Sequence, residues 1–266
     1  MRRELAIWLA VLAAYAALTS IDWPGRERLA VDNSRWLFEL ERSLHIDIEL
    51  ALNHWLVRHE GLRVVANYEY ALTYLVSSLV LLVWLYRRRP ATYYWARSSF
   101  IVMNVASLVC FAVYPVAPPR MLADLGYIDT VVLDGTWGSW GSPMTEHVNQ
   151  LAAMPSLHIG WALWVSLILA TIASGWLVQT VSGCHVLVTL LVIMATANHY
   201  LIDAAGGVLV AVAAVAVTRP RTDGASRRDA AAEAHHRKVA PPATVLPVGG
   251  AAEMVSAFFG NSEGPA

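Results

Sequence analysis

The chain has 266 residues, of which 57% are hydrophobic and only 15% are charged. A soluble domain of this length needs far more charge to cover its surface, so the composition favours a membrane protein. The formal net charge of −1 argues against a surface that binds nucleic acid. Both cysteines, Cys110 and Cys184, lie inside apolar stretches, which favours a packing role over a disulfide or a zinc site.

Six stretches are apolar over a length at or near the roughly 20 residues that a helix needs to cross a bilayer. They comprise residues 5–20, 68–86, 98–116, 155–173, 176–197 and 199–218. The sequence therefore predicts an all-α fold, a polytopic membrane bundle of about six transmembrane helices. The first stretch follows Arg2-Arg3 and contains Ala-Tyr-Ala at residues 14–16, so a cleaved signal peptide is the alternative to an uncleaved span. We expect the uncleaved span.

The arginines predict the orientation of the bundle, because cytoplasmic loops are enriched in basic residues. With the N-terminus inside, the basic residues of 2–3, of 87–97 and of the tail after 218 lie in the cytoplasm, twelve against seven outside. The loop of residues 117–154 then lies outside, and its one basic residue is Arg120. We expect an integral protein of a bacterial cytoplasmic membrane with both termini in the cytoplasm.

Residues 31–63 differ from the spans, because they carry mixed charge with apolar side chains such as Trp36 and Leu40 at helical spacing. This pattern is typical of amphipathic helices that lie in the membrane interface. We expect one or two such helices on the outer side, capped near residues 32–34 and near Asp47. These helices either cover the bundle or gate the access of a substrate.

The composition divides the chain into two parts. Residues 1–218 form the expected membrane domain, which includes the interfacial helices. Residues 219–266 are rich in Ala, Pro, Gly and charge, so we expect a disordered cytoplasmic tail there.

Three polar segments interrupt the apolar sequence at the ends of predicted spans, at residues 114–120, 154–158 and 198–203. The predicted topology puts all three on the outer side, although it was derived from arginines elsewhere. Ionisable residues near a bilayer are costly, and their default interpretation is a functional site. These segments therefore hold the candidate site.

The two histidines of these segments are candidates for catalysis. His199 and Asp203 are four residues apart, so on a helix they share a face and can hydrogen-bond. A carboxylate on one ring nitrogen leaves the other nitrogen free as a nucleophile or base, whereas the alternative is a pair that only ties two helices together. His158 follows Pro155 and Ser156, which suits the first turn of a helix, where free amides favour a phosphate. Taken alone, it is also compatible with an interfacial histidine of no catalytic role.

Arg120 is the candidate residue for binding the phosphate group of a substrate. It follows two prolines, and a guanidinium held by a stiff backbone is suited to bidentate phosphate binding, with interface anchoring as the alternative. Ser156 and Asn198, which lie beside the histidines in sequence, are expected to contribute to the same subsite.

Other histidines are set aside. His45, His54 and His59 lack the tight spacing of metal ligands, so neither a metal nor another cofactor is expected. His185 lies too far along its span from His199 to join the site, and we expect it to hydrogen-bond a neighbouring helix.

Together the polar segments resemble the type 2 phosphatidic acid phosphatase superfamily, over roughly half of the chain. Arg120 matches the arginine of the first motif, Lys-x6-Arg-Pro. Residues 155–158 read Pro-Ser-Leu-His where the second motif reads Pro-Ser-Gly-His, and His199 and Asp203 match the end of the third, Ser-Arg-x5-His-x3-Asp. The resemblance implies a six-helix membrane bundle and a metal-independent phosphohistidine mechanism.

The chain departs from the phosphatase motifs at several positions. Val113 stands at the lysine of the first motif, Met121 follows Arg120, and Val192-Ile193 stand at the Ser-Arg pair of the third. Two phosphate-binding cations are therefore missing. The pattern is more similar to the inositol phosphorylceramide synthase and sphingomyelin synthase branch, whose His-Tyr-x-x-Asp motif matches residues 199–203. Those relatives move a phosphorylated head group between lipids.

The resemblance implies a two-step displacement on a lipid-linked phosphate or phosphodiester. His199, oriented by Asp203, attacks phosphorus, and His158 protonates the departing oxygen. Arg120 and two helix N-termini stabilise the charge on the equatorial oxygens, and His158 then deprotonates water or an acceptor hydroxyl. The rival hypothesis is a lipid or anion transporter or flippase that binds through the same cluster, although the cluster lies at span ends rather than at the midplane. The choice between hydrolase and transferase, the head group and the oligomeric state stay open.

Overall fold

The computed structural model describes residues 2–19, 23–136 and 150–220. Within these ranges the regular structure is helical, apart from one isolated parallel bridge between Val116 and Ala152. The predicted all-α membrane bundle is thereby confirmed. The predicted disordered tail lies outside the described residues except for Arg219 and Pro220.

Four helical segments of the described chain are long and apolar enough to cross a membrane. They are Glu60–Arg88, α6 (Pro90–Val113), α9 (Trp176–Ala195) and α10 (Leu201–Thr218). The first of them is continuous through α4 (Glu60–Tyr68), a π-helical turn η1 (Glu69–Thr73) and α5 (Tyr74–Arg88).

The remaining two predicted spans are also helices. α8 (Leu157–Ile172) is apolar but only 16 residues long. α1 (Arg2–Thr19) has 18 residues, and its first turn includes charged side chains. The second and third spans begin earlier than predicted, at Glu60 and at Pro90. In α6 the reason is the proline at the first helical position, which starts the helix directly after Arg89. Polar residues at these ends continue the helices beyond the apolar stretches.

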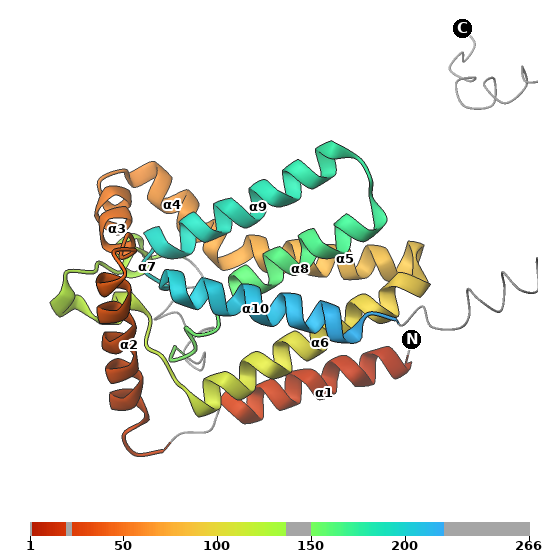
Figure 1. The fold of residues 1–266 in the computed structure, drawn as a ribbon, viewed down its shortest axis with the longest axis horizontal. Helices are drawn as coiled ribbons and strands as arrows, with labels where there is room; N and C mark the ends of the chain where they lie inside the picture. Colours follow the sequence, from red (N-terminus) through yellow and green to blue (C-terminus); the bar gives the residue numbers. More distant parts are fainter. Residues whose placement is uncertain (1, 20–22, 137–149, 221–266) are drawn as a thin grey trace, which may run out of the picture. The chain divides into compact units, whose positions relative to one another are not determined.

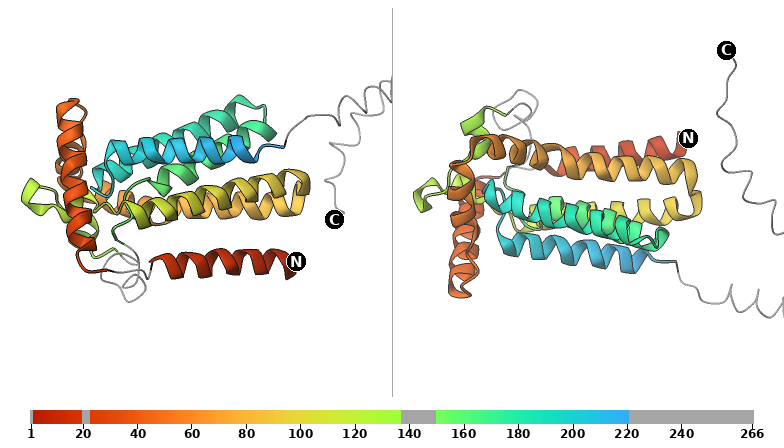
Figure 2. Two further views of the ribbon diagram at one scale, coloured as in Figure 1. Left: turned by 60° about the horizontal axis from the view of Figure 1, so that its bottom comes forward. Right: turned by 90° about the horizontal axis from the view of Figure 1, so that it is seen from above.

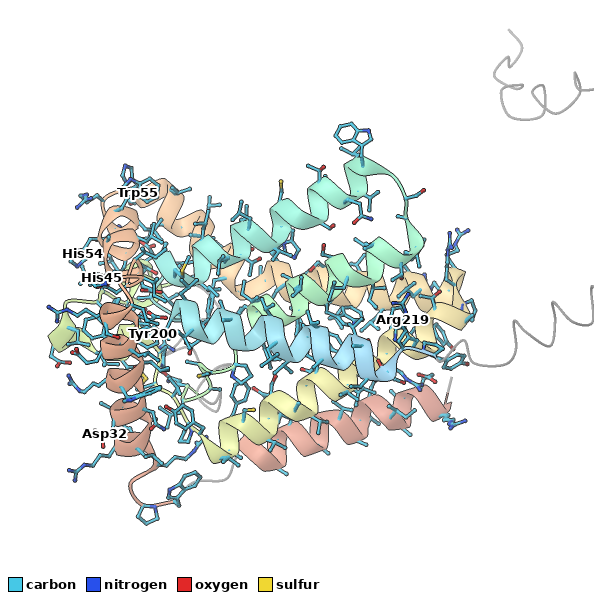
Figure 3. All side chains as sticks on the ribbon, viewed as in Figure 1. Asp32, His45, His54, Trp55, Tyr200 and Arg219 are labelled. Carbon is cyan, nitrogen blue, oxygen red and sulfur yellow. The ribbon has the colours of Figure 1, made fainter. Side chains whose placement is uncertain are left out.

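A second layer covers the end of the bundle at which α8 and α10 begin. It consists of α2 (Arg26–Ser43), α3 (Glu49–Val57) and short elements η2 (Pro119–Met121), η3 (Ala123–Leu125) and α7 (Thr130–Asp134). Figures 1 and 2 show α2 running across this end of the bundle rather than along it. Figure 3 places Tyr200 at this end and Arg219 at the opposite one.

The predicted caps of the outer helices are wrong. α2 begins after Gly25, whose φ of 89° suits glycine, so residues 32–34 lie inside the helix. Their polar side chains serve tertiary contacts instead, since Asn33 Nδ2 donates to Pro115 O at 2.9 Å and Ser34 Oγ lies 3.0 Å from Tyr200 Oη. The helix α3 begins at Glu49 after Ile48, so the predicted cap near Asp47 is also absent there.

The main apolar core joins α5, α6, α8 and α10. Leu85, Met103, Trp164 and Ile168 are fully buried in it. Trp164 Nε1 donates to Ser99 Oγ at 2.9 Å, so the polar edge of this indole is satisfied inside the core. A further polar contact confirms the expectation for His185, whose Nε2 lies 3.2 Å from Oγ of Ser77 on α5.

Glycines bring the beginnings of α8 and α10 together. A Cβ atom at Gly207 would lie 2.2 Å from the backbone oxygen of Ser156, and one at Gly160 would lie 3.4 Å from Met103 Sδ. Because the obstacle at Gly207 is backbone, a larger residue requires the helices to separate. The close crossing therefore sets the start of α8 directly against α10.

Candidate active site

His199 lies in the turn between α9 and α10, because α9 ends at Ala195 and α10 begins at Leu201. The predicted arrangement on one face of a helix is therefore wrong. The turn is tied to α9 by the amides of Asn198 and His199, which donate to Ile193 O at 3.0 and 3.1 Å. These bonds fix the backbone that carries the imidazole.

The ring of His199 is oriented by a backbone carbonyl as well as by a carboxylate. Its Nδ1 lies 2.9 Å from Ala153 O and 3.5 Å from Asp203 Oδ2. A carbonyl oxygen only accepts hydrogen bonds, so Nδ1 carries the hydrogen and Nε2 of the neutral ring carries the lone pair. Asp203 is completely buried, and its Oδ2 also accepts the Tyr200 amide at 2.9 Å.

His158 contacts the nitrogen of His199 that carries the lone pair, Nε2. Its Nδ1 lies 3.1 Å from His199 Nε2, and since that nitrogen accepts, His158 Nδ1 donates. The ring of Tyr70 stacks on His158 with centroids 4.3 Å apart, and the ring of Tyr74 lies tilted against it at 4.2 Å. The two tyrosines come from η1 and from the first residue of α5.

This contact has a consequence for catalysis. In phosphoryl transfer the attacking and leaving atoms lie in line on opposite sides of phosphorus. Because His158 Nδ1 lies 3.1 Å from His199 Nε2, there is no space for a phosphoryl group between these two nitrogens. A phosphoryl transfer that used both histidines would therefore require His158 to move away from His199.

Arg120 docks on the turn that carries His199. Its amide donates to Ala197 O at 2.8 Å, and its Nε donates to Asn198 Oδ1 at 2.9 Å. Asn198 Nδ2 in turn donates to Thr196 Oγ1 at 2.9 Å. Both ends of the Asn198 amide are thus engaged within the protein, so this residue aims Arg120 and is not positioned primarily to contact a substrate.

The Arg120 guanidinium is buried, with a side-chain exposure of 2%, and Nε lies 3.7 Å from Asp129 Oδ2. Burial lowers the pKa of Arg120, and the neighbouring Tyr70 and Asp129 oppose this effect. An arginine remains charged after such a shift, since its ordinary pKa lies far above neutral pH. A charge that is held in a buried place can stabilise a phosphate at low cost in reorganisation.

The start of α8 suits an anion. Ser156 is its N-cap, and the Ser156 amide donates to Asp203 O at 2.9 Å, which binds this turn to α10. The Ser156 side chain does not cap the helix, and among the described residues its buried Oγ has no hydrogen-bond partner. The first-turn amides of a helix have no partner within the helix. The hydroxyl and these amides therefore form a group of donors beside His158.

The start of α10 is different and requires a correction. The amides of Tyr200, Leu201 and Ile202 donate to Asp203 Oδ2, Glu49 Oε1 and Glu41 Oε1 at 2.9, 2.8 and 2.7 Å, respectively. These three donors are occupied by carboxylates. The expectation that two helix N-termini stabilise a phosphate is therefore wrong for α10.

The structure thus brings all six predicted site residues into one connected group, and it adds residues that the sequence analysis did not find. The additions are the flanking rings Tyr70 and Tyr74, the carbonyl of Ala153 and the acids Glu41 and Glu49. A cluster of tyrosines at the start of the second span was a signal for the first two. No local signal identified the glutamates, because charged residues of an amphipathic helix are normally solvated.

A helical membrane bundle with paired histidines, a buried arginine and a helix N-terminus at one end defines a class of membrane protein suited to phosphate chemistry. A family model described as the PAP2 superfamily matches residues 35–217, more than half of the chain. The chain belongs to the PAP2 superfamily, whose members are phosphatases and phosphotransferases. No curated protein and no solved structure matches it.

Proposed function

We propose that the protein is a membrane enzyme that transfers a phosphoryl or phosphorylated head group from a lipid through a phosphohistidine on His199 Nε2. One observation carries this proposal. The Nδ1 atom of His199 is engaged by Ala153 O at 2.9 Å, while its Nε2 faces a second histidine at 3.1 Å. This is the arrangement that a histidine nucleophile requires, with one nitrogen anchored and the other presented.

In the proposed first step the Nε2 lone pair of His199 forms a bond to phosphorus, and the bond from phosphorus to the leaving oxygen breaks. The leaving oxygen takes that electron pair and receives a proton from the imidazolium form of His158, which has first moved away from His199 Nε2 to admit the phosphoryl group. The positive charge that develops on the phosphorylated ring of His199 is stabilised by Asp203, 3.5 Å from Nδ1. The rings of Tyr70 and Tyr74 hold the imidazole of His158 in place beside His199.

In the second step His158, now neutral, accepts the proton of an incoming hydroxyl. The oxygen of that hydroxyl bonds to phosphorus, and the electrons of the bond to nitrogen return to His199 Nε2. With water as the acceptor, a monoester donor gives inorganic phosphate and a diester donor gives a phosphorylated head group, whereas a lipid alcohol as the acceptor gives a new phospholipid. Arg120 and the donors at the start of α8 hold the equatorial oxygens in both steps.

The scarcity of cations supports head-group transfer over hydrolysis of a monoester. A phosphodiester carries one negative charge, whereas a monoester carries nearly two near neutral pH. Arg120 is the one cation of the predicted site, and the start of α10 is lined by carboxylates. This agrees with the similarity of residues 199–203 to the inositol phosphorylceramide synthase and sphingomyelin synthase branch. We propose a lipid phosphodiester as the donor.

We also propose that the site faces the outer side of the membrane and that both termini are cytoplasmic. The distribution of arginines supports this orientation. In Figures 1 and 3 the turn between α5 and α6 and residue Arg219 lie at the end of the bundle opposite to Tyr200.

The test uses the purified full-length chain in detergent with a panel of lipid phosphomonoesters and phosphodiesters, in buffer containing EDTA. We expect activity to survive the chelator, because the proposed nucleophile is a histidine. New phospholipid species indicate a transferase, and inorganic phosphate indicates a phosphatase. Saturable binding without turnover favours the transporter hypothesis. Turnover by His199→Asn at the wild-type rate, or activity that a divalent ion must restore, contradicts the proposal.

A further inference from the structure

Two buried glutamates of the outer layer lie behind the proposed nucleophile. Glu41 is on α2 and Glu49 is the first residue of α3, and both are completely inaccessible to solvent. Charged side chains are almost never fully buried unless they are paired. Among the described residues, no ion pair joins either glutamate to a basic side chain. Their burial therefore needs another explanation.

Each glutamate accepts a hydrogen bond from the backbone at the start of α10. Glu49 Oε1 accepts the Leu201 amide at 2.8 Å, and Glu41 Oε1 accepts the Ile202 amide at 2.7 Å. The positive end of the helix dipole favours negative charge at this place. These bonds connect residues that are 152 and 161 positions apart in sequence, so they fasten α10 to the outer layer.

The second carboxyl oxygen of each glutamate takes no part in these bonds to α10. Among the described residues, Glu41 Oε2 and Glu49 Oε2 are buried and have no hydrogen-bond partner. The two carboxyl groups lie close enough together for the charge of Glu49 to raise the pKa of Glu41. Two carboxylates in contact cannot both ionise at low cost, and one shared proton satisfies the oxygen of each.

The groups around the pair favour this protonated state. Asp203 acts on both glutamates from α10, and the hydroxyls of Tyr200 and Tyr127 lie near enough to feel their charge. Burial raises the pKa of Glu41 to about 8, and the charge of Glu49 adds to this effect. Burial also raises the pKa of Glu49. The pair therefore holds one proton near neutral pH.

We propose that Glu41 and Glu49 are positioning residues for His199, a carboxyl pair that shares one proton and holds the first turn of α10. The turn before α10 is fixed at one side by the bonds to Ile193 O. At the other side the amides of Leu201 and Ile202, two and three residues after His199, are fixed by the pair. His199 is thus held between α9 and the outer layer, which keeps its ring on Ala153 O. The proposal rests on the proposed function only in that His199 is the nucleophile.

A change of charge in the pair should then reach the histidine. When the shared proton leaves, Glu41, Glu49 and Asp203 all carry negative charge at one helix end, and their repulsion separates α2 and α3 from α10. Glutamine at position 41 imitates the protonated state, because its carbonyl accepts the Ile202 amide and its NH₂ donates to Glu49. Alanine at position 41 removes the bond to the helix altogether.

The first measurement does not depend on activity. Nitrogen-15 NMR of histidine-labelled full-length protein in detergent reports which ring nitrogen carries hydrogen, and the resonance of His199 is assigned by its loss in His199→Asn. We expect the Nδ1–H tautomer in the wild type and in Glu41→Gln near pH 7, and a mixture of tautomers in Glu41→Ala. Above about pH 8 the wild type should lose the fixed tautomer and Glu41→Gln should keep it. Glu39→Gln, an exposed glutamate on the same helix, should behave as wild type.

The second measurement is the pH profile of turnover with the substrate that the panel identifies. A displacement of about 1 Å at a reacting group can lower the rate about a hundredfold, so we expect Glu41→Ala to lower kcat by 10- to 100-fold. The KM should change little, because the phosphate is held elsewhere. Glu41→Gln should restore kcat near pH 7 and remove the fall in rate above about pH 8.

The outcomes separate the two proposals. If Glu41→Gln has the same alkaline fall in kcat and the same NMR transition as the wild type, or if Glu41→Ala leaves both unchanged, the positioning role is wrong. If the NMR results are as expected but no substrate is turned over, the proposed function fails and the positioning role stands. A poorly folded Glu41→Ala protein leaves the comparison of Glu41→Gln with Glu39→Gln decisive.

Discussion

The starts of α8 and α10 lie side by side at one end of the bundle, yet they are built in opposite ways. At α8 the hydroxyl of Ser156 has no hydrogen-bond partner among the described residues, and the first-turn amides have none within the helix. At α10 three successive amides are taken by carboxylates, two of which come from the outer layer. Two helix ends with the same dipole therefore serve different purposes. In the proposed mechanism the start of α8 binds the phosphate, and the start of α10 anchors the nucleophile.

The largest effect should come from forcing the two helix starts apart. Gly207→Ala places a Cβ atom 2.2 Å from Ser156 O, so α8 and α10 must separate and the histidines lose their register. We expect kcat to fall by about a hundredfold or more, and the unfolding temperature to fall as well. Gly183→Ala on α9, where a Cβ meets nothing within 4 Å, is the matched control. Equal activity of the two variants contradicts the close crossing.

A smaller effect should follow from removing one donor at the start of α8. A hydrogen bond to a charged group contributes about 1.5–3 kcal/mol, so Ser156→Ala should weaken the inhibition by inorganic vanadate or phosphate by about tenfold or more. Ser166→Ala, on the same helix but paired with Ser182 Oγ, should leave this affinity unchanged. If Glu41→Gln weakens vanadate binding and Ser156→Ala does not, the assignment of the two helix ends is reversed.

The smallest effect concerns stability against pH. A carboxyl with a raised pKa in the folded state binds its proton more tightly there, so its contribution to stability is complete below the unfolded value and declines as pH rises through the folded value, about 8 for Glu41. We expect the wild-type unfolding temperature in detergent to fall by a few degrees between about pH 6 and pH 9. Glu41→Gln should lose much of this slope and Glu39→Gln should retain it. Parallel slopes in all three proteins would show that Glu41 does not hold the proton.

The sequence predicts the helices of the bundle, because hydropathy is a local property, and four of the six predicted spans are long and apolar enough to cross a membrane. It predicts the ends of helices poorly in this chain. Asn33 and Ser34 have the composition of a cap, but they contact Pro115 and Tyr200 in the folded protein. Such contacts depend on packing between distant segments, which no local pattern encodes.

In the candidate site, too, the features that depend on local sequence were predictable and those that depend on packing were not. His158, His199 and Asp203 were found because they are ionisable residues in apolar surroundings. The geometry of His199 was not predictable, because the turn after α9 contains Ala197 with a φ of 54° rather than a glycine or proline that would mark it. Glu41 and Glu49 were missed for a related reason, since their burial depends on the packing of α10 against the outer layer.

The central claim is that His199 Nε2 carries the phosphoryl group, and rapid-quench labelling with a phosphorus-labelled substrate tests it most directly. We expect acid-labile label on the peptide that contains His199, and no label in His199→Ala. In His158→Ala a substrate with a good leaving group should still label His199, and the intermediate should persist because the base for the second step is missing. Turnover on poor leaving groups should fall by about a hundred- to ten-thousandfold in that variant. Label on His158, or label on the His199→Ala protein, contradicts the account.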